Sequence, residues 1–168
     1  MTYFRDLMRQ SEGAVRDQLA EGEQDLASGR CADISTTGDL DSAGAGWTYV
    51  TVTNRHVLWV PDIERLGLIC SLDLDQVRSC TEVHWGHRSA LVMGHDSLTR
   101  LHFVPNGRPL NWTYQRDLVV GSLSTTILGF SRPTAKAAKK LKEQVALRGL
   151  VIGQVQSRDR LPLSLTYR

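Results

Sequence analysis

Short apolar-rich runs separated by turn-forming residues fill residues 26–104, and the run at 47–53 alternates with a period of two, which is the pattern of a half-buried β-strand. In residues 47–53, Tyr49 falls on one face of the expected strand and Val50 and Val52 on or near the other. Turn-forming residues interrupt the pattern every eight to twelve residues or so. The pattern predicts seven strands, over residues 26–34, 47–53, 56–60, 67–74, 77–85, 88–93 and 98–104.

Before this region the spacing of apolar residues changes to three and four, which predicts an N-terminal helix over residues 1–20. Thr2 is a suitable N-cap, and Gly22 lies just past the expected end. We expect this helix to cover the core or an open sheet edge. Oligomerisation or membrane-surface binding is the alternative, and the acidic residues on the polar face weaken the membrane version.

A second helix is predicted after residue 130. Ser131 can cap it, Pro133 suits its first turn, and Gly149 lies just past its end. At about 100° per residue, one face of this helix carries small and apolar side chains and the opposite face carries charge. The face expected to pack on the sheet consists of Thr134, Ala137, Ala138, Leu141 and Val145.

Two segments give weaker patterns. Residues 105–130 begin with two prolines around an Asn-Gly pair and continue into a stretch compatible with strand or helix, so we interpret them as an insertion. Residues 150–168 contain two apolar runs around a charged turn, which favours a C-terminal extension with a hairpin. The expected organisation is a helix (1–20), one mainly β domain of the α+β class (21–149) and this extension.

Composition limits the function classes. The chain has 168 residues, which suits one domain with additions, and a formal net charge of +2, which provides no global field for nucleic acid. Its three cysteines form no CxxC pair and are expected to be buried thiols. No apolar run approaches the roughly 20 residues that span a bilayer, and there is no signal-peptide core. We therefore expect a cytoplasmic protein, with peripheral membrane association as an alternative.

Three segments resemble bacterial pleckstrin-homology-like (PH-like) and related GRAM-type domains. Residues 50–59 (Val-Thr-Val-Thr-Asn-Arg-His-Val-Leu-Trp) look like the family's signature hairpin, in which a strand ends in Thr-Asn-Arg. Residues 70–79 are similar to a later strand transition, and residues 19–26 resemble the acidic lead-in to the first strand. The resemblance covers roughly residues 19–148. It implies a strongly bent antiparallel sheet, or partly open barrel, of about seven strands closed by a C-terminal helix.

The resemblance also raises phosphoinositide binding, since members with that activity place Lys and Arg around the first hairpin loop. Here no Lys or Arg occurs between Arg30 and Arg55, and the loop contains Asp39 and Asp41. A different basic group exists, because every lysine of the chain lies on the second helix: Lys136, Lys139, Lys140 and Lys142. The ordinary interpretation of such a run is a solvated helix face, and polyanion binding through Lys136, Lys139 and Lys140 is the alternative.

No catalytic constellation is apparent. His84 and His87 are three residues apart and suggest a metal-dependent enzyme as a third possibility, but no ligand set of known spacing completes them. Nucleophile elbow, phosphate loop and HExxH motifs are absent, so we expect no cofactor. Trp112 and Tyr114 form an aromatic pair in the expected insertion, where they suit either a partner-binding patch or a cover for the barrel mouth.

Three functions are left, in order of preference. The first is a non-enzymatic module that binds a protein or peptide partner, by strand addition at a sheet edge or between the edge strand and the last helix. The second is peripheral binding of an anionic lipid or another polyanion through the lysines, and nucleic acid is disfavoured as a ligand. The third is an enzyme using the histidines. The sequence indicates neither the partner nor the oligomeric state.

Overall fold

The computed structural model describes residues 9, 12–33, 48–60, 68–85, 88–102, 116–119, 124–130 and 134–156. In these ranges the protein is mainly β. Its strands are β1 (Asp25–Asp33), β2 (Thr48–Thr53), β3 (His56–Trp59), β4 (Leu68–Asp73), β5 (Val77–Trp85), β6 (Arg88–His95), β7 (Leu98–His102), β8 (Arg116–Val119), β9 (Ser124–Phe130) and β10 (Ile152–Gln156). Residues 12–17 are helical, and α3 spans Ala135–Leu147.

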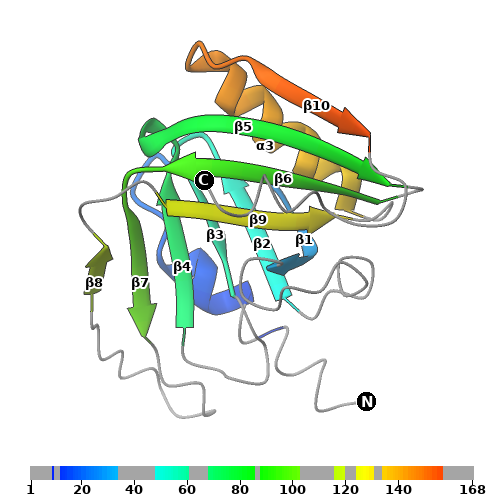
Figure 1. The fold of residues 1–168 in the computed structure, drawn as a ribbon. Helices are drawn as coiled ribbons and strands as arrows, with labels where there is room; N and C mark the ends of the chain where they lie inside the picture. The colour runs from blue at the N-terminus through cyan, green and yellow to red at the C-terminus, as the bar shows by residue number, and fades with distance from the viewer. Residues whose placement is uncertain are drawn as a thin grey trace.

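The strands form one sheet in the order β10-β5-β6-β9-β1-β2-β3-β4-β7-β8, which bends at β1. Residues 25–31 of β1 pair with β2, whereas Ala32 and Asp33 at its end pair with β9. Figure 1 shows the result, with β5, β6 and β9 running across the direction of β2, β3, β4 and β7. Among the described strands, β10 and β8 are the two ends of the order, so the sheet is bent but does not close into a barrel.

The main core lies inside this bend, under α3. Trp59 is 1% exposed and packs in the same cluster as the buried face of the helix. That face consists of the residues that the sequence predicted: Thr134, Ala137, Ala138, Leu141 and Val145 are all buried. Gly149 ends the helix with a φ of 83°, a left-handed conformation that favours glycine, as expected for a residue just past the last turn.

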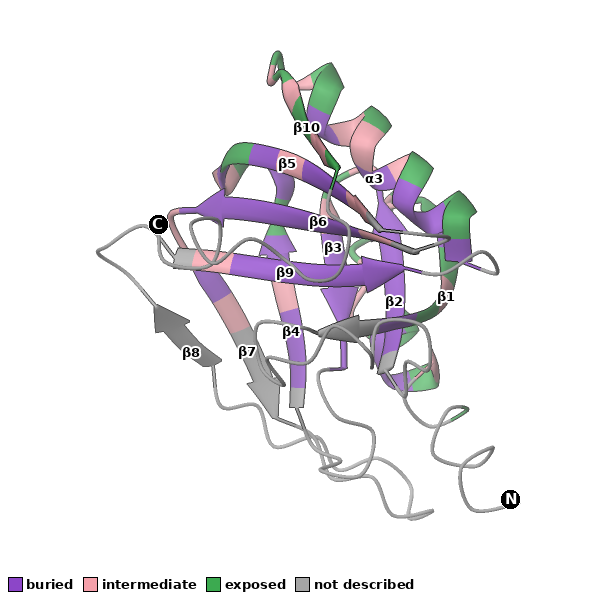
Figure 2. Cartoon of the chain, turned by 45° about the vertical axis from the view of Figure 1, so that its right-hand side comes forward, coloured by how far each residue is buried: buried purple, intermediate pink, exposed green. Residues whose placement is uncertain are grey.

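The outer side of β2, β3 and β4 is also buried. Alternate residues of these strands turn away from the main core and form a second cluster with the helical residues 12–17. This cluster contains Ala14, Val15, Tyr49, Leu58, Val60 and Ile69. The described part of the N-terminal helix therefore covers an outer face of the sheet and forms a second core there, where an open edge was the other expectation. Figure 2 shows much of β2 and β3 in the colour of buried residues.

All seven strands predicted from the alternating pattern are present, and three more are added. β8 lies in the expected insertion and pairs with β7. β9 occupies the last part of the same segment but lies in the middle of the sheet, between β6 and β1, so these residues belong to the sheet itself. β10 begins the expected C-terminal extension as a strand parallel to β5, and the second arm of the predicted hairpin lies outside the described residues.

The Thr-Asn-Arg sequence of the β2–β3 turn has a local structural explanation. Thr53 Oγ1 accepts hydrogen bonds from the backbone N–H groups of Arg55 (3.0 Å) and His56 (2.8 Å), which closes the turn. Asn54 Oδ1 accepts from the backbone N–H of Gln24 (2.9 Å) and so ties the turn to the chain just before β1. The motif that carried the family resemblance therefore builds a junction between strands.

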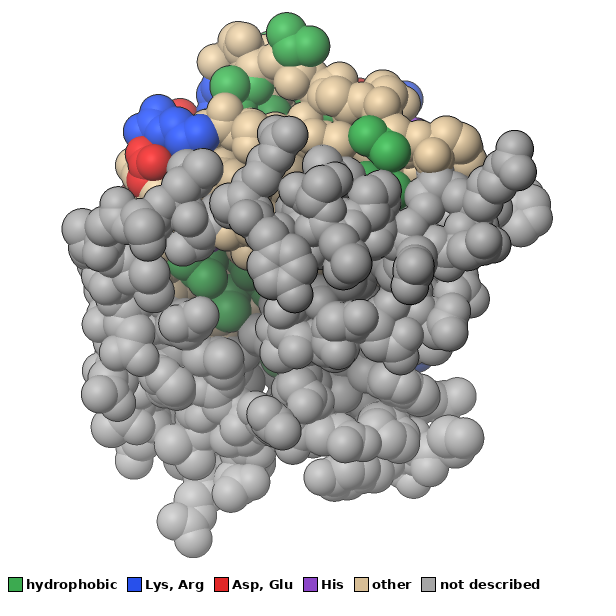
Figure 3. All heavy atoms as spheres, viewed as in Figure 1, with side chains coloured by type: hydrophobic (Ala, Val, Ile, Leu, Met, Phe, Trp, Pro, Cys, Tyr) green, Lys and Arg blue, Asp and Glu red, His purple; other side chains and the backbone are tan. Residues whose placement is uncertain are grey.

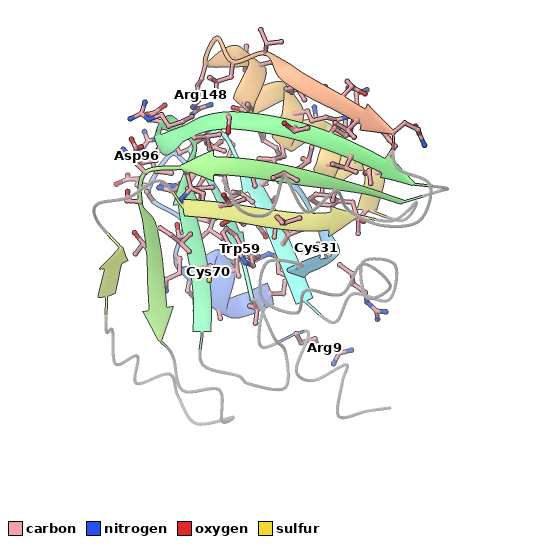
Figure 4. The ribbon with its side chains drawn as sticks, viewed as in Figure 1. Arg9, Cys31, Trp59, Cys70, Asp96 and Arg148 are labelled. Atoms are coloured by element: carbon pink, nitrogen blue, oxygen red, sulfur yellow. The ribbon has the colours of Figure 1, made fainter. Side chains whose placement is uncertain are left out.

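Arg148 connects this junction to the end of α3. Its guanidinium donates to the backbone oxygen of Asn54 (2.9 Å), to Asp75 Oδ1 (2.9 Å) and to the backbone oxygen of Gln144 (3.0 Å). Figure 4 places Arg148 at the end of the molecule where β5 begins, on the same side as Asp96. One side chain thereby fixes the C-terminal end of the helix to the turn beneath it.

None of the described helices combines the length and the apolar composition needed to cross a bilayer.

Candidate partner-binding edge

β10 extends the sheet at the edge formed by β5. Its register pairs Ile152 with Cys80, Gln154 with Glu82 and Gln156 with His84, in parallel, whereas the other described strand pairs are antiparallel. β10 follows α3 directly and lies against it (Figure 1). The β5 edge beside α3 therefore holds an extended segment of the chain itself.

β10 is attached with little side-chain burial. Ile152 and Val155 are half-buried, and Gly153, Gln154 and Gln156 are exposed. Val151, just before the strand, is 90% exposed. Figure 3 shows that the described surface in this upper part of the molecule consists mostly of backbone, uncharged polar groups and some hydrophobic side chains. Edge strands are normally protected by charge, proline or a bulge, and β10 carries none of these.

A buried carboxylate lies beside this edge. Glu82 on β5 is 3% exposed and accepts hydrogen bonds from groups of three elements. Lys142 Nζ of α3 lies 2.7 Å from Glu82 Oε2, and Gln154 Nε2 of β10 lies 3.2 Å from Oε1. His84 Nε2, on β5 itself, is 2.8 Å from the same Oε1. The cluster joins helix, sheet and added strand through one side chain.

Two opposing effects act on the pKa of Glu82. Burial favours the neutral acid and would raise the pKa, but the hydrogen bond and charge of Lys142, together with His84, outweigh it and lower the pKa. Glu82 is thus a carboxylate at neutral pH. Burial, with Glu82 adding to it, raises the pKa of the nearby Cys80 thiol to about 12, so this thiol is not a nucleophile at neutral pH.

Gly153 of β10 lies close to Thr81 of β5. A Cβ placed on Gly153 would lie 3.3 Å from Thr81 Oγ1 and 3.8 Å from Thr81 Cβ. The first distance is shorter than ordinary van der Waals contact between a carbon and its neighbours. A side chain at this position would need Thr81 to shift by a few tenths of an ångström, so a small residue fits most easily here.

The lysines of α3 do not act as one group. Lys142 is paired with the buried Glu82, and Lys140 lies 3.3 Å from Glu143. Lys136 and Lys139 are exposed, and no described acidic group forms an ion pair with either. Of the three lysines proposed for polyanion binding, two are therefore unpaired within the described part of the chain.

The remaining predicted site residues are not brought together. His84 belongs to the Glu82 cluster, and His87 lies outside the described residues. The described ranges contain no group of three or more His, Cys, Asp or Glu side chains arranged to hold a metal ion. All three cysteines are buried thiols, as expected. Trp112, Tyr114 and the loop from residue 35 to 46 also lie outside the described residues.

His95 is a buried histidine on the inward face of β6. Its Nε2 lies 2.8 Å from Thr126 Oγ1, while its buried Nδ1 has no hydrogen-bond partner among the described residues. Burial lowers the pKa of His95, although Asp96 and the Ser97 backbone act in the opposite direction. The imidazole is therefore held neutral.

This burial predicts a pH-dependent stability. Below about pH 6.5 the unfolded chain protonates His95 and the folded protein resists doing so, so the free energy of unfolding falls as the pH drops from 7 to 5. We expect His95→Gln, which keeps a polar group near Thr126, to reduce that slope in urea unfolding measured at several pH values. If the free energy of unfolding of this variant depends on pH as steeply as that of the wild type, the other histidines cause the pH dependence.

The Glu82 cluster was missed in the sequence because its parts are far apart. Glu82 lies in a predicted strand on the same side as Cys80, and that alternation was a weak signal for an inward-facing carboxylate. Lys142 and Gln154 reach it only through the packing of α3 and β10. A carboxylate surrounded by three donors at a sheet edge can fix the position of an added strand.

Comparisons of the chain with protein-family models, with curated proteins and with solved structures gave no match.

Proposed function

We propose that the protein is a non-enzymatic binding module that holds an extended segment of a protein or peptide partner at the β5–β10 edge of the sheet, beside α3. One observation carries the proposal. This edge already accommodates an added strand, β10, which pairs with β5 through its backbone and buries few side chains of its own. Main-chain pairing gives affinity to such recognition, and the side chains along the edge give specificity.

We further propose that the fold is PH-like. Support comes from the strand order once the β7–β8 pair and β10 are set aside. The remaining seven strands are antiparallel neighbours in the order β5-β6-β9-β1-β2-β3-β4, in a bent sheet with α3 packed over its core. This is the number of strands and the kind of closure that the family resemblance implies. On this proposal β7 and β8 are an addition to the common sheet.

A proline scan of β10 tests the edge site. Adjacent residues of a strand direct their N–H groups to opposite sides, so Gln154→Pro and Val155→Pro remove one N–H that faces β5 and one that faces outward. Peptides of twelve residues would be selected from a random phage-displayed library on the wild-type chain. We expect their affinity to change in at least one of the two proline variants, as measured by biolayer interferometry.

The matched control is the combined variant Lys136→Gln, Lys139→Gln, Lys140→Gln, which leaves β10 and Lys142 intact. Its exposed positions should matter little to strand addition, and the binding should depend weakly on salt. Equal peptide affinity for the wild type and both proline variants would contradict the edge site. Salt-sensitive binding that disappears in the triple variant would favour the polyanion alternative.

A further inference from the structure

We propose that β10 is a resident ligand of the β5 edge, and that a partner segment with the same residue pattern binds by replacing it. This inference rests on the proposed function and specifies the ligand and the regulation of that site. It follows from how β10 is attached, from what each of its positions meets on β5, and from the short connection that links it to α3.

The attachment of β10 is weak for a structural strand. Three of its five residues are exposed, and the other two are only half-buried. Ile152 packs against the main core cluster from its margin, and Gln154 supplies a side-chain hydrogen bond to Glu82. The strand is held largely by its backbone pairing with β5, which any extended segment can offer.

The contacts of β10 define a residue pattern for the partner. The first position is apolar, because Ile152 meets the core cluster. The second is small, because Thr81 leaves little room beside Gly153. The third is a hydrogen-bond donor, because Gln154 donates to the carboxylate of Glu82. The fourth is apolar again, since Val155 is half-buried. The ligand is therefore an uncharged or donor-bearing extended segment that runs parallel to β5.

The carboxylate of Glu82 makes the third position selective for charge. Glu82 is nearly fully buried and has its pKa lowered, so it presents acceptor oxygens and a negative charge to the third position. A carboxylate in the partner at that position would face the like charge of Glu82. The edge therefore rejects acidic residues at the position where it accepts glutamine.

The connection between α3 and β10 makes the resident strand a strong competitor. Residues 148–151 separate the two elements, so β10 is always close to the edge, at an effective concentration in the millimolar range or above. A free segment binds only in proportion to the fraction of molecules whose edge is vacant. Loosening β10 is thus expected to raise the apparent affinity for a partner without changing the edge itself.

A disulfide lock provides the test. The distance of 3.8 Å between the Cβ position of residue 153 and the Cβ of Thr81 matches the spacing of a disulfide, so Thr81→Cys with Gly153→Cys can fix β10 on β5. The probe is a fluorescent peptide with the sequence of residues 150–156, and its binding is measured by anisotropy. A second protein, Ile152→Ser, loosens β10 by removing its contact with the core.

We expect the peptide to bind Ile152→Ser about tenfold more tightly than the wild type, because more of its edges are vacant. The oxidised lock should not bind it, and reduction with dithiothreitol should restore binding. The single-cysteine variants control for the substitutions themselves. A matched peptide carrying Gln154→Glu should bind at least tenfold more weakly to Ile152→Ser.

Two results would overturn the inference. Equal binding to the oxidised and reduced lock would mean that the segment is added without replacing β10. Failure of the peptide to bind Ile152→Ser would mean that the β5 edge does not accept this pattern from another molecule. Neither result by itself contradicts the proposed function. If library-selected peptides bind the oxidised lock, the sheet still has a partner site, on the outer side of β10.

Discussion

Leu141→Ala is expected to lower the free energy of unfolding by about 2–5 kcal/mol. Leu141 has no exposed surface and lies in the cluster that contains Trp59 and the inward residues of several strands. Shortening it leaves a cavity in close-packed surroundings, so the lost transfer free energy and the cavity both contribute. Urea unfolding followed by tryptophan fluorescence measures the difference, with the slope of the transition checked to be unchanged.

Lys140→Ala is the control on the neighbouring residue. Its ammonium group pairs with Glu143 on the same exposed side of α3, and such a pair contributes little because water screens it. We expect a change of less than about 0.5 kcal/mol. Similar losses for Leu141→Ala and Lys140→Ala would contradict the assignment of the helix faces.

Lys142→Met is expected to cost about 1–3 kcal/mol, because it leaves the buried Glu82 without its main cationic partner. Methionine preserves most of the aliphatic length, so the loss reports the missing charge and hydrogen bond rather than lost packing. Lys139→Met is the matched control one helical turn away. Lys139 is exposed, and its replacement should change stability by less than about 0.5 kcal/mol.

The difference between these variants should depend on pH. The pKa of Glu82 is lowered in the folded protein, so the stabilisation it provides is present above its unfolded value and is lost as the pH falls through the folded pKa. In Lys142→Met, burial acts on Glu82 with His84 and Gln154 but no lysine beside it, so the pKa of Glu82 rises. The penalty of Lys142→Met should therefore begin to shrink as the pH falls through this raised pKa, and it should vanish below the lowered pKa of Glu82 in the wild type. A penalty that is constant with pH would show that Glu82 is not its source.

The Glu82 cluster connects the stability of the fold with the proposed binding site. Glu82 holds Lys142 of α3 and Gln154 of β10 at once, so Lys142→Met also alters the group that a partner segment would meet. If a partner segment replaces β10, the same residues, Glu82 and Lys142, both stabilise the fold near this edge and select the ligand. Lys136 and Lys139, in contrast, are exposed and lie outside the cluster, so replacing them changes only the charge of the surface.

Local patterns were sufficient for the elements themselves. Short apolar-rich runs bounded by turn residues located seven strands from β1 to β7, because turn residues end a strand and apolar residues mark the part of it that is buried. The spacing of Ala137, Leu141 and Val145 identified the buried face of α3 for the same reason at a helical period. Glycine chemistry placed the end of that helix, since Gly149 adopts a positive φ that other residues avoid, whereas its N-cap is Thr134 and not the expected Ser131.

Local patterns were insufficient where pairing is non-local. The sequence of β9 suited either a strand or a helix. It forms a central strand because it pairs with β6 on one side and with the end of β1 on the other. Polar residues mixed into this segment hid that role, since Thr126 is buried but satisfied by a hydrogen bond with His95. The Trp112 and Tyr114 prediction lies outside the described residues and stays a prediction.

The sequence by itself determined the mainly β class, the β2–β3 hairpin, the faces of α3 and the burial of the cysteines, because each depends on neighbours within a few residues or on side-chain polarity alone. Tertiary structure alone decided that Glu82 is a buried carboxylate between Lys142 and Gln154, and that β10 lies parallel on β5. These features join segments about 70 residues apart. The candidate site exists only where such distant segments meet, since hydrogen-bond geometry depends on their positions in space.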